Sequence, residues 1–354
     1  MKILLVGELG PGGSMGLIYD NLLKLGVDVQ LVNTNQYFTP SLFNRVMSRF
    51  FIASGLLPTP IYFGSGIKKL NNIIVEKARV GKFGFILFMK PILIYPSTVV
   101  ELKKFAKLIS WYPDHVDFTK SGSTYFYKSI PLYDCHLAAI SANVEPLLRW
   151  GAKRAIYLTV SADASCHHPV LITEGDRKKL GADVVFIGTY AKENRSEYLE
   201  KLCRDGYDIK IYGNSWGRLP WNSCLRRKNR IVPGGVYCED MARVLGASKI
   251  ALAFMRKHNQ EYVACRSWEI PLCGGFMLHE RTEEAEKMLL AGKETDFFDS
   301  YEEMKEKIDY YLKHPELRER IAKAGRERIL NGGELLDSIV KKLLEILMNE
   351  FGIK

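Results

Sequence analysis

The stretch from Lys249 to Leu278 constrains the fold of this chain more than any other. An apolar run, Lys249 to Met255, is followed by a polar loop, a short amphipathic segment, Gly274-Gly275 and a second apolar triplet, Phe276 to Leu278. This order is typical of a strand, loop, helix and strand unit in a parallel sheet. The loop and the helix N-terminus of such a unit lie at the carboxyl edge of the sheet, where backbone N–H groups favour an anion such as a diphosphate.

Two glutamates, Glu261 and Glu269, lie in this unit with seven residues between them. A carboxylate is poorly suited to hold a phosphate but well suited to accept hydrogen bonds from sugar hydroxyls. On spacing alone, the pair is equally well explained as ordinary solvated helix residues.

The N-terminus repeats the strand-to-helix pattern. Ile3 to Gly7 is predicted to be a strand, Gly12 and Gly13 lie in the loop that follows, and Met15 to Leu25 has the apolar spacing of a helix. Glycines there let the backbone approach a ligand closely, although a tight turn without a ligand would need them too. The loop is not a regular Gly-x-Gly-x-x-Gly, and no acidic residue ends the next strand, Val27 to Val32, so NAD is not favoured.

The chain has 354 residues, enough for two domains with separate cores. Its seven cysteines are odd in number and scattered, which predicts a reduced, cytoplasmic protein without disulfides or structural zinc. Met1 to Gly7 runs into a glycine loop too early for a signal peptide. The longest apolar stretch, Phe83 to Val100, is interrupted by a lysine and two prolines, so no membrane span is expected.

The net charge of +10 suggests an anionic partner: nucleic acid, an anionic membrane surface or a diphosphate-containing substrate. No nucleic-acid-binding module is recognisable, which argues against the first. The segment 41–52 is predicted to be a helix with Arg45 and Arg49 away from its apolar side, which carries Leu42, Val46, Met47, Phe50 and Phe51. Such a helix can lie on a membrane, but packing of its apolar side into its own domain is the favoured interpretation.

The Glu261 to Glu269 spacing, followed by a small-residue turn, resembles the donor-site motif of retaining glycosyltransferases of the GT-B architecture. The string Arg266 to Leu278 is similar to the CgeB-like (spore-maturation) branch of the group 1 glycosyltransferases. The similarity continues through Glu280 to Glu284 and Ala322 to Arg328, so that it covers about ninety residues of the C-terminal half closely.

This resemblance implies an α/β protein with two Rossmann-like, doubly wound parallel-sheet domains facing a central cleft. Residues 1–164 would form the acceptor-side domain, with a C-terminal helix, 335–354, crossing back to it, and residues 165–334 would bind a nucleotide sugar. The implied activity is a hexosyltransferase-like transfer from a nucleoside-diphosphate sugar to a hydroxyl of a glycan, lipid or small molecule, with retention, without metal and without a cofactor. The alternative is a non-catalytic nucleotide-sugar-binding protein or a sugar epimerase of the same fold.

The resemblance also places an acceptor-side group at the ends of two N-terminal strands. Lys90 follows the strand Phe85 to Phe88, and Asp114 and His115 follow the strand that begins at Leu108. Asp114 would orient a hydroxyl and His115 would bond the donor sugar, although Asp114 could equally cap the next helix. With Glu261, these are the expected catalytic residues.

On the donor side, Arg195 is expected just before a helix that starts at Ser196, where its guanidinium suits bidentate contact with a diphosphate; a solvent-facing arginine is the alternative. No Asp-x-Asp occurs, and the adjacent His167 and His168 lack a metal-ligand spacing, so no metal site is expected. The expected donor-binding residues are Gly12, Gly13, Gly188, Arg195, Tyr237, Lys257, Tyr262, Val263, Arg266 and Glu269.

Overall fold

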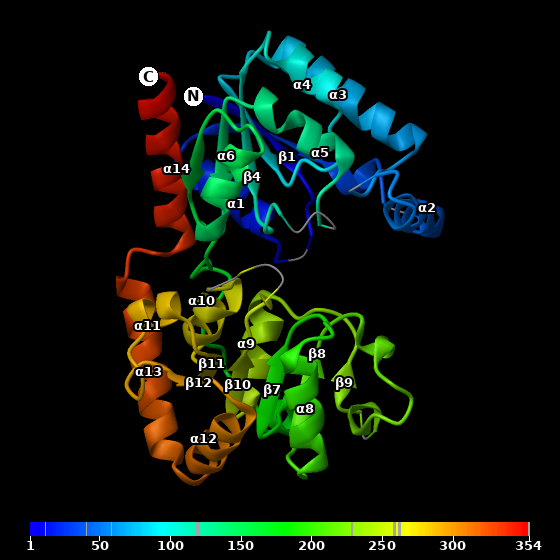
Figure 1. Cartoon of the computed structure of the whole chain (residues 1–354). Coiled ribbons are helices and arrows are strands. Elements are labelled where there is room, and N and C mark those ends of the chain that lie inside the picture. Colours follow the sequence, from blue (N-terminus) through cyan, green and yellow to red (C-terminus); the bar gives the residue numbers. More distant parts are fainter. Residues whose placement is uncertain are drawn as a thin grey trace. The chain divides into compact units, whose positions relative to one another are not determined.

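The computed structural model describes residues 1–352 except Pro11, Pro40, Pro58, 118–120, Lys228, 258–259 and 261–262. The chain forms two compact units (Figure 1). Unit 1 contains Met1–Val160 and the C-terminal segment Leu336–Lys354, and unit 2 contains Ser161–Lys257 and Glu261–Leu335. The expected division of the chain was at 164/165 and 334/335.

Unit 1 is built on a parallel sheet whose strand order is β2-β1-β3-β4-β5-β6 in the described part of the chain. Alternate residues of each strand face opposite sides, and apolar side chains fill both, which explains the continuous apolar runs in the sequence. The strands are β1 (Lys2–Gly7), β2 (Asp28–Asn33), β3 (Phe85–Met89), β4 (Lys107–Tyr112), β5 (Cys135–Ala138) and β6 (Ala155–Tyr157).

Helices cover both faces of this sheet. On one face, α1 (Ser14–Lys24) and α14 (Leu336–Phe351) pack together and against Ile3 and Leu5 of β1, so the last helix of the chain lies in the same unit as the N-terminus (Figure 1). On the other face, α3 and α4 pack against Leu4 and Val6. The other helices of the unit are α2 (Leu42–Ala53), α3 (Ser65–Gly81), α4 (Pro96–Leu102), α5 (Thr124–Ser129) and α6 (Val144–Arg149).

Unit 2 repeats this plan with a parallel sheet of order β12-β11-β10-β7-β8-β9. Its central strands again carry apolar residues on both faces: Phe186 and Leu252 face α8 and α12, and Val185 and Ala251 face α9 and α10. The strands are β7 (Val184–Ile187), β8 (Ile209–Tyr212), β9 (Ile231–Val232), β10 (Ile250–Ala253), β11 (Met277–Glu280) and β12 (Asp296–Phe298). The helices are α7 (Glu174–Leu180), α8 (Asn194–Arg204), α9 (Cys238–Ala247), α10 (Cys265–Leu272), α11 (Glu283–Met288), α12 (Tyr301–Lys313) and α13 (Pro315–Asn331).

Two parallel sheets with helices on both faces confirm the predicted α/β class with two Rossmann-like domains. Among the helices of the described chain, none is both long and apolar enough to cross a membrane.

The expectation of no disulfides is wrong. In unit 2, Cys166 is bonded to Cys238 and Cys203 to Cys224, with Cα atoms 4.7 and 6.3 Å apart. The partners are 72 and 21 residues apart in sequence, and only the tertiary fold brings them together. Scattered cysteines without a recognisable spacing carry no pairing information of their own, which is why the sequence did not reveal the bonds.

The carboxyl ends of β7 and β8 approach each other so closely that one glycine is essential there. A Cβ atom at Gly213 would lie 2.1 Å from the carbonyl oxygen of Gly188. We therefore expect Gly213→Ala to lower the free energy of unfolding in urea by about 1–3 kcal/mol, because backbone must move to make room. Gly217→Ala is the matched control, since a Cβ there meets no atom within 4 Å. Equal stabilities for the two variants would contradict the predicted contact.

Candidate nucleotide-sugar site

The strand, loop, helix and strand predicted for Lys249 to Leu278 is present as β10, a loop, α10 and β11. Ala264 is the N-cap of α10, and the Ser267 hydroxyl, one turn into the helix, accepts a hydrogen bond from the backbone N–H of Ala264 at 3.3 Å. The same hydroxyl lies 2.8 Å from Nε2 of His279 on β11. The start of α10 is therefore held in place at the carboxyl edge of the sheet, where a helix N-terminus favours an anion.

Arg266 and Glu269, both predicted donor-binding residues, lie together on α10. The Arg266 Nε–H donates to the carbonyl of Ile187 at the end of β7 at 3.2 Å, and Nη1 donates to Oε2 of Glu269. Burial lowers the pKa of the Arg266 guanidinium, and the Glu269 carboxylate compensates its charge. Glu269 is only 8% exposed, so the interpretation of this glutamate as a solvated helix residue is wrong.

The structure places Arg195 differently from the expectation. Helix α8 begins at Asn194, so Arg195 lies in its first turn rather than before it. Its side chain is 4% exposed and pairs with Glu193 at 3.4 Å, which excludes a solvent-facing arginine. Gly188 follows β7 directly, as predicted, and Tyr237 is the N-cap residue of α9 with a partly exposed side chain.

Glu280, at the end of β11, is a structural residue of this edge that the sequence did not single out. One carboxylate oxygen accepts from the backbone N–H of Met255 at 2.8 Å, and the other accepts from Nδ2 of Asn194 at 2.6 Å. It therefore ties the loop after β10 to the start of α8, next to Arg195. In the sequence, Glu280 follows the apolar triplet Phe276 to Leu278 by two residues and begins the segment Glu280 to Glu284 that continues the family resemblance, without an assigned role.

The loop between β10 and α10 contains four further predicted site residues, two of which the structure describes. Lys257 is exposed and Val263 packs at the edge of the core below α9 and α10. Glu261 and Tyr262 lie outside the described residues, so the role of Glu261 and the Glu261 to Glu269 motif stay predictions.

In unit 1, the structure brings together two of the predicted catalytic side chains. Lys90 follows β3, and its Nζ lies 2.5 Å from Oδ2 of Asp114, which follows β4. The neighbouring His115 is buried, with 4% of its surface exposed. Adjacent parallel strands end at the same edge of the sheet, and this geometry explains why two residues far apart in sequence pair there.

Asp114 does not cap α5, the α-helix that follows it in the described part of the chain. Ser123 is the N-cap of α5, and its hydroxyl accepts from the backbone N–H of Phe126 at 3.1 Å. The loop at Asp114 is held instead by the buried Asn143, whose Nδ2 donates to the Asp114 carbonyl at 2.6 Å. Asn143 was not among the predicted residues.

The glycine loop after β1 leads directly into α1. Gly13 is the N-cap of α1, and its carbonyl accepts from the backbone N–H of Gly16 at 3.0 Å. Gly12 has a φ of +60°, a left-handed conformation that favours glycine. In the described part of the chain, no group of three His, Cys, Asp or Glu side chains is placed to hold a metal ion.

Comparison with known proteins finds a similar family for part of the chain and similar structures for nearly all of it. Residues 195–345, from the first turn of α8 to within α14, match the model of a family described as glycosyl transferase-like. No curated protein matches the chain.

Several solved structures match nearly the whole chain. A glycosyltransferase from Rickettsia africae has 16% identity and a TM-score of 0.63, with 98% of each chain covered. Anabaena HepE in complex with UDP-glucose has 14% identity and a TM-score of 0.64, with 99% of this chain and 100% of that chain covered. An α-glucosyltransferase in complex with UDP-glucose and DNA has 12% identity and a TM-score of 0.66, with 98% and 99% covered. The protein thus has the two-domain fold of these glycosyltransferases, and the segment 195–345 is glycosyl transferase-like in sequence.

Proposed function

We propose that this protein is a glycosyltransferase that moves a sugar from a nucleoside-diphosphate donor to an acceptor hydroxyl. We assign it to the CgeB-like branch of the group 1 enzymes on the Arg266 to Leu278 string. The donor binds unit 2 and is itself the substrate, so the reaction uses no separate cofactor. UDP-glucose is the first donor to try, because HepE and the α-glucosyltransferase were solved with it.

The observation that carries this proposal is the ion pair within α10 between the partly exposed Arg266 in the first turn and the buried Glu269 one turn further on. It lies inside the segment that matches the glycosyl transferase-like family. A buried carboxylate beside a helix N-terminus offers acceptors for ribose hydroxyls, while the N–H groups of the helix offer donors for the diphosphate. A nucleoside diphosphate presents both kinds of group in one molecule.

The proposed reaction proceeds with retention of the anomeric configuration and without metal. The bond between the anomeric carbon and the diphosphate oxygen breaks, and the acceptor oxygen forms its bond on the same face while its proton passes to the departing diphosphate. Negative charge gathers on the diphosphate, and the backbone N–H groups of α10 with the cations Arg195 and Lys257 are the groups assigned to stabilise it. Lys90, Asp114 and His115 are assigned to the acceptor side.

Turnover with product analysis tests the proposal. The protein is incubated with UDP-glucose, then with other nucleotide sugars, and with a panel of hydroxyl acceptors, while release of the nucleoside diphosphate is measured. NMR of the first-formed glycoside is expected to show the anomeric configuration of the donor, with equal rates in EDTA and in magnesium. An inverted anomer, or activity that EDTA abolishes and magnesium restores, would contradict the stereochemical and metal assignments.

The same experiment separates the alternatives. A donor that binds without being turned over would indicate a nucleotide-sugar-binding protein. A donor whose sugar is isomerised while the diphosphate remains attached would indicate an epimerase. Either result would overturn the proposed transferase.

We further propose that α2 attaches the protein to an anionic membrane, where a lipid-linked acceptor would be available. The face of α2 that packs inward is polar: the buried Asn44 bonds to the backbone of Phe63 and the buried Ser48 donates to the carbonyl of Ile61 at 2.6 Å. The outward face is apolar, with Leu42 and Phe43 72% and 64% exposed. Of the predicted apolar side, Met47 and Phe51 are half-buried, with the Phe51 ring against Phe63, so the favoured prediction that this side packs into its own domain is wrong for Leu42, Val46 and Phe50.

The charge of the chain supports the proposal of an anionic membrane over a neutral partner for this face. Helix α2 contains two arginines in its sequence, Arg45 and Arg49. The exposed Lys68 and Lys69 lie near the start of α3, and the whole chain has a net charge of +10. A basic helix with exposed aromatic residues inserts its apolar face between lipids while its cations attract anionic headgroups.

Sedimentation with vesicles tests this attachment. We expect the protein to pellet with phosphatidylcholine vesicles containing phosphatidylglycerol but not with phosphatidylcholine alone. The double variant Phe43→Ser, Phe50→Ser should lose most of this binding, whereas Leu171→Ser, at a residue in unit 2 that is 89% exposed, should keep it. Unchanged binding of the double variant would exclude α2 as the attachment site.

A further inference from the structure

A turn that precedes α7 brings a histidine to the Glu269 carboxylate. Asp163 organises the turn: its Oδ1 accepts from the backbone N–H of Ser165 at 2.7 Å, and its carbonyl accepts from the backbone N–H of His167 at 2.8 Å. His167 is 2% exposed, and its Nε2 lies 3.5 Å from Oε1 of Glu269. The two oxygens of Glu269 thus face different partners, Arg266 on one side and His167 on the other.

The surroundings of His167 select one tautomer. Burial lowers its pKa, so the ring is neutral at neutral pH. Nδ1 lies 3.3 Å from the backbone nitrogen of Asp163, whose N–H can donate to it, and 3.1 Å from the Asp163 carbonyl oxygen, which would accept a proton carried by Nδ1. A proton on Nε2 points toward the Glu269 carboxylate, the only charged group of these three. The other tautomer would set the Nε2 lone pair against a carboxylate oxygen, which is unfavourable. We therefore assign the proton to Nε2.

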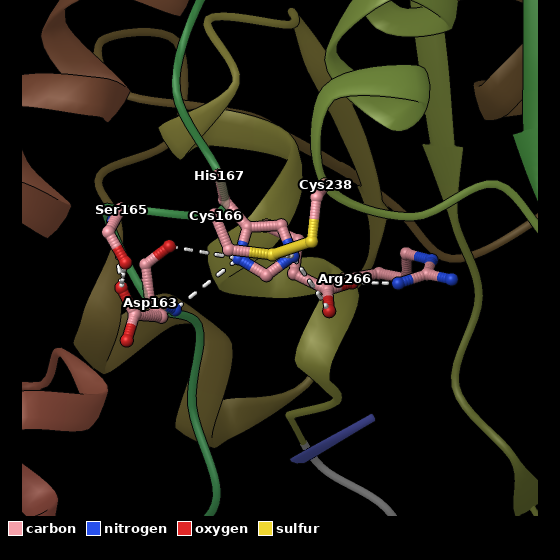
Figure 2. Close-up of a disulfide and its surroundings, with 7 residues drawn as sticks. Asp163, Ser165, Cys166, His167, Cys238 and Arg266 are labelled. Atoms are coloured by element: carbon pink, nitrogen blue, oxygen red, sulfur yellow. Dashed lines mark hydrogen bonds and ion pairs between the residues drawn. A yellow bond between two sulfur atoms is a disulfide. The ribbon is translucent and has the colours of Figure 1, made fainter. Parts of the chain in front are cut away.

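A covalent bond anchors this turn to another element of unit 2. Cys166, adjacent to His167, is bonded to Cys238 at the start of α9 (Figure 2). Figure 2 shows the disulfide passing across the His167 ring in this view, with Asp163 to the left of the ring. Cys238 has a φ of +48°, a left-handed conformation that residues with a Cβ rarely adopt. The surrounding contacts therefore stabilise a strained backbone at the start of α9.

We propose that His167, held by the Cys166–Cys238 disulfide, is a positioning residue that orients Glu269 toward the ribose of the donor, so that reduction of this disulfide weakens donor binding. The inference rests on the proposed function and extends it to control by the thiol redox state. Glu269 needs both partners: Arg266 fixes one oxygen, and the Nε2–H of His167 limits rotation of the carboxylate about the other.

Reduction changes the surroundings of His167 in two ways. A dithiol such as dithiothreitol gives two electrons and two protons to the Cys166–Cys238 bond, forming two thiols while the dithiol closes to its own disulfide. The turn then loses its link to α9. The Cys166 sulfur, 3.8 Å from Nε2 of His167, also becomes a thiol that is no longer fixed to α9 and whose sulfur can compete with Glu269 for the Nε2–H.

Titration calorimetry with uridine diphosphate tests the role of His167. His167→Leu should raise Kd about tenfold, the equivalent of about 1.4 kcal/mol, because Glu269 loses one of the two groups that orient it. His167→Gln, whose amide N–H can reach the same oxygen, should restore most of the affinity. A thermal melt of each variant reports folding separately. A wild-type Kd for a folded His167→Leu protein would overturn the inference, whereas failure of the wild-type protein to bind any nucleoside diphosphate would overturn the proposed function instead.

The redox step is tested on the unaltered chain. Dithiothreitol should raise the Kd of the wild-type protein about tenfold, and Cys238→Ser should show the weaker affinity with or without the reductant. Cys224→Ser is the matched control: it removes the other disulfide of unit 2 and should behave as the wild type in both conditions. Mass spectrometry of alkylated cysteines verifies the state of each bond. An unchanged Kd after verified reduction of Cys166–Cys238 would overturn the redox control.

Discussion

Replacing Glu269 with alanine is expected to weaken binding of uridine diphosphate by about 1–3 kcal/mol, which is about 5- to 150-fold in Kd. The buried carboxylate is the group proposed to accept the ribose hydroxyls, and its loss leaves those hydroxyls without partners in a site shielded from water. Calorimetry at neutral pH measures the effect. Within this range the loss should exceed the tenfold effect expected for His167→Leu, because alanine removes the carboxylate itself rather than one of the groups that orient it.

Two controls separate binding from folding in this experiment. Glu269→Gln keeps the size of the side chain and one oxygen acceptor, so it should lose less affinity than the alanine variant. Glu269→Ala also leaves Arg266 without its carboxylate partner, and urea unfolding measures that cost independently. An unchanged Kd for a folded alanine variant would remove Glu269 from the donor site.

Mild acid is expected to destabilise both units, because each contains a fully buried neutral histidine. Burial lowers the pKa of His136 in unit 1 and of His279 in unit 2 to about 4, against about 6.5 in an unfolded chain. Between these pH values the unfolded chain binds protons that the folded chain does not bind. The contribution of each neutral histidine to the free energy of unfolding is therefore fully present above pH 6.5 and falls as the pH approaches 4. The loss approaches about 3 kcal/mol for each histidine.

Urea unfolding at pH 7, 5.5 and 4.5 measures this loss. His136→Gln and His279→Gln should each flatten the dependence of unfolding free energy on pH, even where they lower stability at pH 7 by disturbing a bond. His279 accepts from Ser267 at the start of α10, so its variant also reports on the donor side. The same slope in wild type and in both variants would show that other groups cause the acid sensitivity.

The sequence predicted the elements of the fold well where apolar residues recur at a regular period. The strand, loop, helix and strand around α10 and the helix predicted for Met15 to Leu25, which is α1, are present as expected, because burial on one or both faces imposes a pattern that can be recognised locally. That Lys90 and Asp114 lie near each other could also be predicted, because residues that follow neighbouring parallel strands lie at the same edge of the sheet.

Features that depend on tertiary contact were not predictable in this way. The apolar pattern of α2 is correct, but a pattern alone does not show which face of a helix is buried. In the structure, hydrogen bonds of Asn44 and Ser48 bury the polar face instead. His167 carried no signal beyond its neighbour His168, because its partner Glu269 lies about a hundred residues away. The Cys166–Cys238 bond was hidden for the same reason.

A crystal structure of the protein with UDP-glucose is the most direct test of the proposed nucleotide-sugar site. The proposal predicts that the ribose hydroxyls lie within hydrogen-bonding distance of the Glu269 carboxylate and that the diphosphate lies at the N-terminus of α10, with His167 still facing Glu269. A nucleotide bound at any other edge, with Glu269 paired only to Arg266 and His167, would contradict it.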